Sequence, residues 1–326
     1  MKTGFKIAGI CLLAAVISII ARIYIPDKFI DSTGDTIAAE ADMSVNNTDM
    51  SVNATDKSNN ETSITKEKVF MSYNSIPIMQ GVWEITDGTA DSPSFVDVYL
   101  IEGTEKALLI DAGVSGDYLR DYVKTLTGKP VELVLTHGHG DHIAAISQFK
   151  TVFMSSNDFD LLKPYTPFDD FESSGYKDIR GGETFDLGGC KLEVIALPGH
   201  TPGSVVLLDR ERQFLFAGDA IGSGSLWMQL PESSTVEEFR DEMQKFGKSL
   251  EALTELKPYL GHNCLMGRKP DKDYITDTRI AAEKIVSGEL TGVPTDRKDF
   301  PGAVTVSYGQ MTDFLYRPEK IMKKGE

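Results

Sequence analysis

Cysteine is scarce in this chain of 326 residues and occurs only at Cys11, Cys190 and Cys264. Cys11 lies in an apolar stretch near the N-terminus, so the rest of the chain can form at most one disulfide. This excludes a fold stapled by several disulfides. Cys190 follows Gly188-Gly189, a hairpin-turn signal. Pairing of Cys190 with Cys264 stays open, and the expectation for each is a buried free thiol.

Positive charge is also in short supply. The chain has 33 Lys and Arg against 49 Asp and Glu, a net charge of −16. Subtracting the +3 of residues 1–30 and the −6 of residues 31–67 leaves −13 on residues 68–326. An acidic domain repels phosphate backbones. We therefore expect no nucleic-acid partner.

Long uncharged runs are rare, and the clearest is Ile7 to Ala21, which follows two lysines near the N-terminus. This arrangement is typical of a secretory signal or a membrane anchor. No small-x-small cleavage site follows directly, and Ile23-Tyr24-Ile25 extends the run past Arg22, which favours an uncleaved anchor. We expect residues 1–30 to be a signal peptide or membrane anchor, and the protein to be exported, membrane-anchored or secreted, and extracytoplasmic.

Residues 31–67 are dominated by Ser, Thr, Asn and Asp and contain a near repeat, Met43 to Asp49 and Met50 to Asp56. Such a segment buries too little apolar surface to fold. It is predicted to be a disordered polar linker that leads to a folded domain over residues 68–326.

The domain alternates strand and helix signals. Alternation and hairpin punctuation predict the strands, and helical apolar spacing predicts the helices. The expected strands are 82–86, 95–102, 107–110, 131–135, 192–197, 214–217, 259–260 and 304–308. The expected helices are 118–126, 143–149 and 273–286. A Thr235-x-x-Glu238 capping box predicts a further helix with an apolar stripe. Residues 155–182 are expected to be loop with short helical pieces.

Histidine is rare, and its five occurrences are informative. Three of them fall in one heptapeptide, Thr136-His137-Gly138-His139-Gly140-Asp141-His142, directly after the strand predicted at 131–135. In extended chain, residues two apart point the same way, so His137 and His139 can face one point. Gly140 lets the backbone turn Asp141 and His142 elsewhere. The spacing therefore suggests two adjacent ion sites.

The other polar candidates also follow predicted strands. Residues 192–197 lead into Pro198-Gly199-His200, residues 214–217 into Gly218-Asp219, and Tyr259-Leu260 into Gly261-His262. Side chains carried on strand ends are held by a rigid scaffold. All five histidines thus occupy positions that a metal-binding interpretation requires, whereas a single histidine is more often a core or surface residue.

In this order the residues resemble the metallo-β-lactamase superfamily, whose signature is H-x-H-x-D-H, a later histidine, a later aspartate and a final histidine. The resemblance covers about residues 70–265. It implies an α/β (α+β) fold, the four-layer αβ/βα sandwich, in which two mixed β-sheets lie face to face with helices outside.

The resemblance also implies the ligands. His137, His139 and His200 would hold one ion, Asp141, His142 and His262 a second, and Asp219 would bridge both. An all-nitrogen and oxygen ligand set suits two Zn²⁺, although Fe or Mn would accept it.

Two catalytic residues are expected beside the ions. Two adjacent ions lower the pKa of a shared water and polarise a carbonyl or phosphoryl oxygen, which favours hydrolysis. Asp141 would pass a proton to the leaving group. Asp111, which matches the motif aspartate after an early strand, would orient a ligand by hydrogen bonding. Trp227, in a loop after Asp219, is the predicted pocket wall, with an ordinary packing role as its alternative.

The expected function is a glyoxalase II-like dinuclear hydrolase that cleaves a small ester, thioester, lactone or amide. Asp219 stands where one main group of true β-lactamases has cysteine, so β-lactam hydrolysis is a minority hypothesis. A phosphodiesterase, a persulfide dioxygenase with one iron and a non-catalytic binding module stay open as alternatives. Tyr165, Tyr176 and Tyr308 are further hydroxyl candidates near a substrate, and the sequence does not select among them.

Overall fold

The structure describes the domain predicted over residues 68–326 from Tyr73 onward. The computed structural model describes residues 73–89, 92–266 and 269–324. The chain divides into two units, Met1–Ser72 with Thr89–Ser94, and Tyr73–Gly88 with Phe95–Glu326. The second unit contains the predicted domain and its candidate ligands. The predicted segments 1–30 and 31–67 lie outside the described residues, so both stay predictions. None of the described helices is long and apolar enough to cross a bilayer.

The first sheet contains seven strands of the described chain, hydrogen-bonded in sequence order. They are β1 (Tyr73–Met79), β2 (Val82–Thr89), β3 (Ser92–Glu102), β4 (Ala107–Ile110), β5 (Val131–Val134), β6 (Val152–Met154) and β7 (Lys177–Asp178). β1 pairs with β2 and β3 with β4 in antiparallel fashion, whereas β4 to β7 run parallel. The sheet is therefore mixed, as predicted.

The sequence misses three strands of this sheet. β1 contains Pro77, which a strand tolerates only at the edge of a sheet, and β1 is indeed an edge strand. β6 and β7 are only three and two residues long and carry no alternation signal.

The second sheet contains five described strands in the order β13-β11-β10-β9-β8. They are β8 (Thr184–Asp186), β9 (Lys191–Ala196), β10 (Val205–Asp209), β11 (Phe214–Gly218) and β13 (Lys257–Leu260). Every residue of β10 and β11 is buried. A strand covered on both faces is apolar along its whole length, which explains the continuous runs in the sequence.

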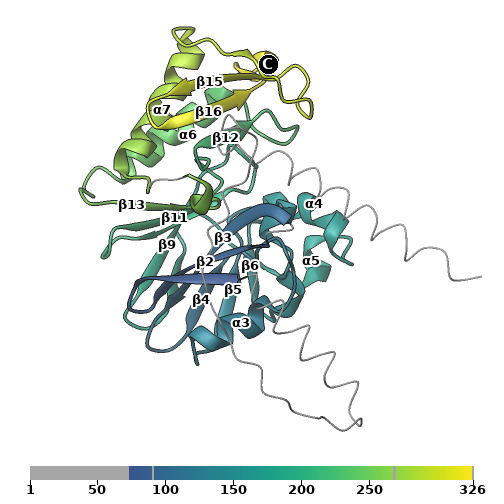
Figure 1. Cartoon of the computed structure of the whole chain (residues 1–326), viewed down its shortest axis with the longest axis vertical. Helices are drawn as coiled ribbons and strands as arrows, with labels where there is room; N and C mark the ends of the chain where they lie inside the picture. Colours follow the sequence, from purple (N-terminus) through teal and green to yellow (C-terminus); the bar gives the residue numbers. More distant parts are fainter. Residues whose placement is uncertain (1–72, 90–91, 267–268, 325–326) are drawn as a thin grey trace, which may run out of the picture. The chain divides into compact units, whose positions relative to one another are not determined.

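The two sheets pack face to face, and helices cover the outer face of the second sheet. Leu207 and Phe216 point into a core shared with Tyr99 and Ile110 of the first sheet. The alternate residues of β10 and β11 join a second core with α6 (Val236–Ser249) and α7 (Lys272–Ser287). Figure 1 shows α6 and α7 on the far side of β11 and β13 from the first sheet.

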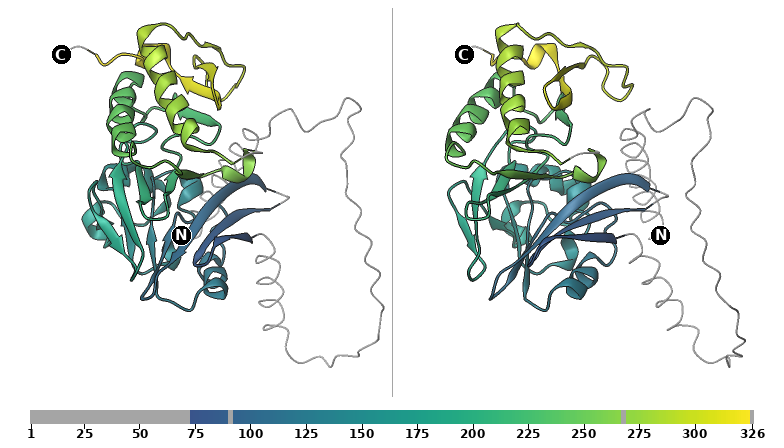
Figure 2. Two further views of the ribbon diagram at one scale, coloured as in Figure 1. Left: turned by 90° about the vertical axis from the view of Figure 1, so that its left-hand side faces the viewer. Right: turned by 60° about the vertical axis from the view of Figure 1, so that its left-hand side comes forward.

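Three short helices, α3 (Leu119–Leu126), α4 (Phe159–Leu162) and α5 (Phe171–Ser174), lie beside the first sheet (Figure 1 and Figure 2). With α6 and α7 on the second sheet, they complete the predicted four-layer αβ/βα sandwich. Residues 155–182 form short helical pieces and loops, as expected. The helix predicted over 143–149 is wrong in extent, because only a 3₁₀ turn over Ile146–Gln148 forms there.

A third sheet extends the fold beyond the expectation. Among the described residues it has four strands in the order β12-β16-β15-β14. They are β12 (Ser225–Met228), β14 (Val293–Pro294), β15 (Val304–Tyr308) and β16 (Met311–Tyr316). The prediction of a flexible loop after Asp219 is therefore wrong for 225–228, because β12 pairs in parallel with β16, far away in the sequence. Residues 304–308 form the predicted strand, in this sheet.

The cysteines are both free thiols. Cys190 is buried, as expected, whereas Cys264 is exposed, so the expectation of burial is wrong for Cys264. Cys264 lies in a 3₁₀ turn over Asn263–Leu265, after β13 has ended, where the chain has left the core.

Helix α6 begins at the predicted capping box. The Thr235 hydroxyl accepts a hydrogen bond from the Glu238 amide at 3.2 Å, and the Glu238 carboxylate accepts one from the Thr235 amide at 3.1 Å. These bonds satisfy two amides that the first helical turn leaves without partners. The cap fixes the start of the helix that covers the second sheet.

Replacing Thr235 with alanine removes one half of this capping box. We expect Thr235→Ala to lower the free energy of unfolding by about 1 kcal/mol, the usual contribution of a hydroxyl cap. Chemical denaturation of the full-length protein, followed by circular dichroism, measures this. Thr235→Ser keeps the hydroxyl and should stay within about 0.5 kcal/mol of the wild type. Equal losses in both variants would show that the hydroxyl does not cap α6.

Candidate metal centre

The predicted ligands come together where strands of the first two sheets end. β11 and β13 are parallel neighbours, so Asp219 and His262, which follow them, lie at one edge of the second sheet. The Gly261 amide donates to the Gly218 carbonyl at 2.9 Å. The Val205 amide donates to the Thr136 carbonyl, also at 2.9 Å, and so joins β10 to the histidine loop after β5.

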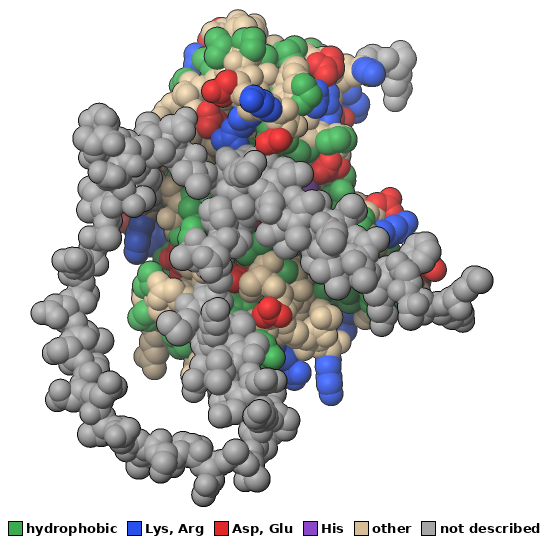
Figure 3. Space-filling model, turned by 45° about the vertical axis from the view of Figure 1, so that its right-hand side comes forward, with side chains coloured by type: hydrophobic (Ala, Val, Ile, Leu, Met, Phe, Trp, Pro, Cys, Tyr) green, Lys and Arg blue, Asp and Glu red, His purple; other side chains and the backbone are tan. Residues whose placement is uncertain are grey.

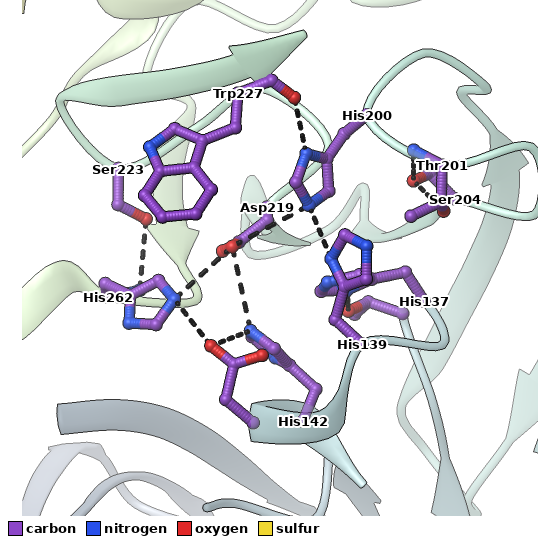
Figure 4. Close-up of polar contacts among 12 residues, drawn as sticks. His137, His139, His142, His200, Thr201, Ser204, Asp219, Ser223, Trp227 and His262 are labelled. Carbon is purple, nitrogen blue, oxygen red and sulfur yellow. Dashed lines mark hydrogen bonds and ion pairs between the residues drawn. The ribbon is translucent and has the colours of Figure 1, made fainter. Parts of the chain in front are cut away.

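Three histidines form the first group. Potential ligand atoms of His137, His139 and His200 all lie within 4.8 Å of one another. The closest pair is His139 Nδ1 and His200 Nε2, at 2.9 Å. His137 and His200 are fully buried, and Figure 4 shows the three rings converging.

Asp141, His142 and His262 form the second group, again with ligand atoms within 4.8 Å of one another. Asp141 Oδ2 lies 3.6 Å from His262 Nε2 and 3.9 Å from His142 Nε2. The Asp141 side chain is 13% exposed and those of the two histidines 0% and 3%. The Asp141 carboxylate is therefore the more accessible member of this group.

Asp219 lies between the two groups. Its Oδ2 is 3.3 Å from His262 Nε2 and 3.7 Å from His142 Nε2, both of the second group. The same oxygen is 4.0 Å from His200 Nε2 of the first group. One carboxylate thus faces ligands of both groups, as the sequence predicts (Figure 4).

Each histidine has one ring nitrogen held by an outer partner. His142 Nδ1 donates to Asp111 Oδ2 at 2.9 Å, and Asp111 Oδ1 in turn accepts from the Thr136 amide at 2.7 Å. His137 Nδ1 shares a hydrogen bond with the Thr136 hydroxyl at 3.1 Å. Asp111 is buried and has a φ of 66°, in the left-handed region. The structure therefore places Asp111 behind the ligands, where the sequence predicts a positioning role.

The remaining three histidines bond to partners that the sequence does not predict. His139 Nε2 donates to Glu232 Oε1 at 2.8 Å. His200 Nδ1 donates to the Trp227 carbonyl at 2.8 Å, and His262 Nδ1 to the Phe95 carbonyl at 2.7 Å. Carboxylate and carbonyl partners of this kind fix the tautomer and leave the opposite nitrogen available to a metal. No sequence motif connects Glu232 with His139, because the two residues are 93 positions apart in the chain.

The inward-facing atoms fit a metal. His137 Nε2 and His142 Nε2 are buried and have no hydrogen-bond partner. An unsatisfied buried polar atom destabilises a fold. With protons on their outer nitrogens, His139 and His200 also direct lone pairs at each other across 2.9 Å, an arrangement that a cation stabilises. The nitrogen and oxygen donors suit zinc best.

The two groups differ in their electrostatics. Burial, reinforced by the neighbouring histidines, lowers the pKa of His137 well below its usual value and that of His200 to about 4. These two imidazoles are therefore neutral at pH 7, which is the form that binds metal. Burial also lowers the pKa of His262, but Asp219 and Asp141 outweigh it and raise that pKa to about 9.

Trp227 lies at the centre as well. Figure 4 shows its indole beside His262 and Asp219. The ring packs edge-on against Phe300, with centroids 5.0 Å apart, and the Arg297 guanidinium lies over it at 5.8 Å. Its predicted role as a pocket wall stays a prediction, and the third sheet now gives the ring a fixed position through β12.

The structure distinguishes the three tyrosines that the sequence leaves equal. A Cβ on Gly140 would lie 3.1 Å from the Tyr165 hydroxyl, so this tyrosine packs over the histidine loop beside Asp141. Tyr308 lies in β15 and belongs to the third sheet. Tyr176 packs against Phe168, with ring centroids 5.8 Å apart. Tyr165 is therefore the hydroxyl that lies next to a predicted ligand.

Comparison with known proteins agrees with the geometry. A profile of the metallo-beta-lactamase superfamily matches residues 91–260. The chain is 27% identical over 191 residues to acyl-coenzyme A thioesterase MBLAC2 of Gallus gallus, covering 48% of this chain and 69% of that protein. It is 25% identical over 169 residues to hydroxyacylglutathione hydrolase of Francisella tularensis, covering 52% of this chain and 63% of that protein.

A solved structure confirms the fold. The metallo-beta-lactamase from Pontibacter korlensis superposes with a TM-score of 0.53 at 19% identity, covering 65% of this chain and 99% of that one. The fold and the site define a metal-dependent hydrolase. The chain belongs to the metallo-β-lactamase superfamily, as its histidine motif predicts.

Asp111→Asn tests the outer partner of His142. The amide keeps the size of the side chain, and asparagine tolerates the left-handed φ of 66°. Because the negative charge behind His142 is lost, we expect zinc to bind roughly 10- to 100-fold more weakly. Competition with a chromophoric chelator measures the affinity. An unchanged affinity would contradict the positioning role of Asp111.

Metal should also stabilise the fold, since it satisfies buried atoms that otherwise have no partner. With free zinc at 100 times its dissociation constant, the free energy of unfolding should rise by about 2.7 kcal/mol. Denaturation of the full-length protein with zinc and with excess chelator gives the difference. Identical curves would show that these atoms do not form a metal site in the native state.

Proposed function

We propose that the protein is a dinuclear zinc hydrolase that cleaves a small thioester. The observation that supports this most is the position of Asp219 Oδ2, which lies 3.3 Å from His262 Nε2 and 4.0 Å from His200 Nε2 and so faces both ligand groups. A carboxylate that faces both groups could contact an ion in each, because it has two acceptor oxygens. Among esters, thioesters, lactones and amides, thioesters come first because two relatives are named for thioester hydrolysis, acyl-coenzyme A thioesterase and hydroxyacylglutathione hydrolase.

Each ligand group has its own part in the reaction. Bound zinc supplies positive charge that polarises a carbonyl and acidifies water. His137, His139 and His200 would hold one ion, and Asp141, His142 and His262 the other. The outer partners Asp111, Glu232 and two carbonyls keep the imidazoles from rotating, so the site needs little rearrangement as charge develops on the substrate.

Asp141 is the residue placed to move a proton. Its carboxylate is the open member of the second group, and its Oδ2 lies 3.6 Å from His262 Nε2. A carboxylate at the open side can take a proton from the attacking water and give it to the leaving thiolate. The Tyr165 hydroxyl, packed over Gly140, and the Trp227 ring would line the entrance for the substrate.

The partners and the location follow from the sequence. We propose a small-molecule substrate, no nucleic-acid partner and attachment to a membrane through residues 1–30, with the domain on the extracytoplasmic side. The acidic net charge of residues 68–326 supports the absence of a nucleic-acid partner. On the upper part of the face in Figure 3, described basic side chains lie beside acidic ones. Fractionation of cells tests the attachment. Recovery of the intact chain in the soluble cytosolic fraction would contradict it.

Alanine variants of the shared carboxylate and of a second-group ligand test the mechanism. We expect Asp219→Ala and His262→Ala to lower thioester kcat/KM at least about 100-fold, because stabilisation of the developing charge is lost. Circular dichroism should show an intact fold. The wild type should bind about two zinc ions per chain and prefer the thioester to a lactone, a cephalosporin and a bis-aryl phosphodiester.

Specific results would refute this proposal. Full activity in both variants would exclude the two-metal mechanism. A preference for the phosphodiester would favour the phosphodiesterase alternative. A single iron without any hydrolysis would favour the persulfide dioxygenase alternative, which consumption of oxygen would identify.

A further inference from the structure

A buried carboxylate outside the ligand set joins two of the ligand-bearing loops. Asp158 ends the 3₁₀ turn Ser156–Asp158 after β6, and it is 1% exposed. Its Oδ2 accepts from the Gly138 amide at 2.9 Å and from the Thr201 hydroxyl at 2.7 Å. Its Oδ1 accepts from the Gly203 amide at 2.5 Å. Three donors thus converge on one side chain.

These donors come from the two loops that carry the three-histidine group. Gly138 lies between His137 and His139, and Thr201 directly follows His200. The two loops therefore meet at the same carboxylate. The Thr201 hydroxyl also bonds to Ser204 Oγ at 2.7 Å, which extends the contact along the second loop (Figure 4).

Close packing around Asp158 shows that the loops are shaped to it. A Cβ on Gly203 would lie 2.6 Å from Asp158 Cγ, and a Cβ on Gly138 would lie 2.9 Å from the Asp158 carbonyl oxygen. Neither distance is compatible with a side chain. Gly203 is therefore explained by the approach of its backbone to Asp158, and Gly138 by its approach to Asp158 and Leu162.

A carboxylate buried to this extent is stable only when its oxygens are bonded. Two amides and a hydroxyl supply those bonds. The same hydrogen bonds restrain the Asp158 side chain and the two loops. The separation of the loops matters at the ångström level, because His139 Nδ1 and His200 Nε2 are 2.9 Å apart and a displacement of either loop changes that distance directly.

The second ligand group is anchored differently. His142 is held by Asp111, and its carbonyl accepts from the Ala112 amide at 2.7 Å. His262 is held by the Phe95 carbonyl at 2.7 Å and follows β13. Each of these two residues thus has an anchor other than Asp158. A change at Asp158 should therefore affect one group more than the other.

We propose that Asp158 is a positioning residue that sets the spacing of the His137–His139 and His200 loops and thereby the metal affinity of the three-histidine group. The proposal rests on the metal centre proposed above. It assigns Asp158 no contact with substrate or with the ion. The backbone bond from Val205 to the Thr136 carbonyl persists in any side-chain variant and keeps β10 joined to the histidine loop.

The test uses the full-length protein and measures metal affinity rather than turnover alone. His262→Ala removes a ligand of the second group, and the zinc retained in that background is assigned to the three histidines. Asp158→Asn in the same background should weaken the binding of this zinc ion roughly 10- to 100-fold, because one hydrogen-bond acceptor is lost and an amide N–H faces a donor. In a His139→Ala background, Asp158→Asn should change the affinity of the remaining site less than about threefold. Chelator competition gives each constant.

Two variants at Thr201 provide a second test, which remains valid if Asp158→Asn fails to fold. Thr201→Val removes the donor to Asp158 at nearly constant volume, whereas Thr201→Ser keeps it. We expect Thr201→Val to weaken zinc in the His262→Ala background by roughly tenfold and Thr201→Ser to stay near the parent. In the otherwise wild-type protein, Thr201→Val should lower kcat more than it raises KM, because the reacting groups are displaced and the substrate surface is not.

The outcomes separate the inference from the proposed function. Unchanged zinc affinity in both Asp158→Asn and Thr201→Val, with a loss of folding stability alone, would leave Asp158 a purely structural residue and overturn the inference. Equal weakening in the two backgrounds would also overturn it. A wild type that binds zinc but cleaves no thioester would refute the proposed function and leave the affinity test valid. A wild type that binds no zinc would refute both.

Discussion

One constraint governs the structure: five imidazoles and two carboxylates lie in one buried cluster, and burying these polar groups together is electrostatically unfavourable. Buried polar atoms need partners, and like groups repel at these separations. The fold answers in two ways. It gives every histidine an outer hydrogen-bond acceptor, such as Asp111 or Glu232, and it directs the inner atoms at points where a cation would satisfy them. The cluster is therefore organised around positive charge supplied from outside the chain.

The two halves of this cluster are unlike, and the difference comes from their neighbours. His137 and His200 are surrounded by other imidazoles and burial keeps them neutral, whereas His262 lies beside two carboxylates and its pKa rises to about 9. His137 and His200 are therefore in the form that binds a cation. The second half must release a proton when a cation binds. Asp219 couples the halves because its carboxylate faces both.

The scaffold explains how ligands that are far apart in the sequence come to have closely defined positions in the structure. Parallel pairing makes β11 and β13 end together, and the face-to-face sheets bring the end of β5 to the same place. The third sheet adds a further constraint. β12 is held against β16, and this fixes the Trp227 carbonyl that accepts from His200. Part of the C-terminal region thus supports a ligand that precedes it by about a hundred residues.

The candidate ligands and the outline of the fold could be predicted from the sequence. The histidine heptapeptide, His200, Asp219 and His262 follow predicted strands, which is local information, and their order resembles the signature of the superfamily. The long apolar strands and α6 follow from periodicity in the same way. Only the tertiary structure decided the partners behind the ligands. Glu232 reaches His139 across 93 residues, and Asp158 lies in a segment whose sequence predicts little beyond loop. The third sheet likewise depends on pairing between short, distant strands, which no local pattern encodes.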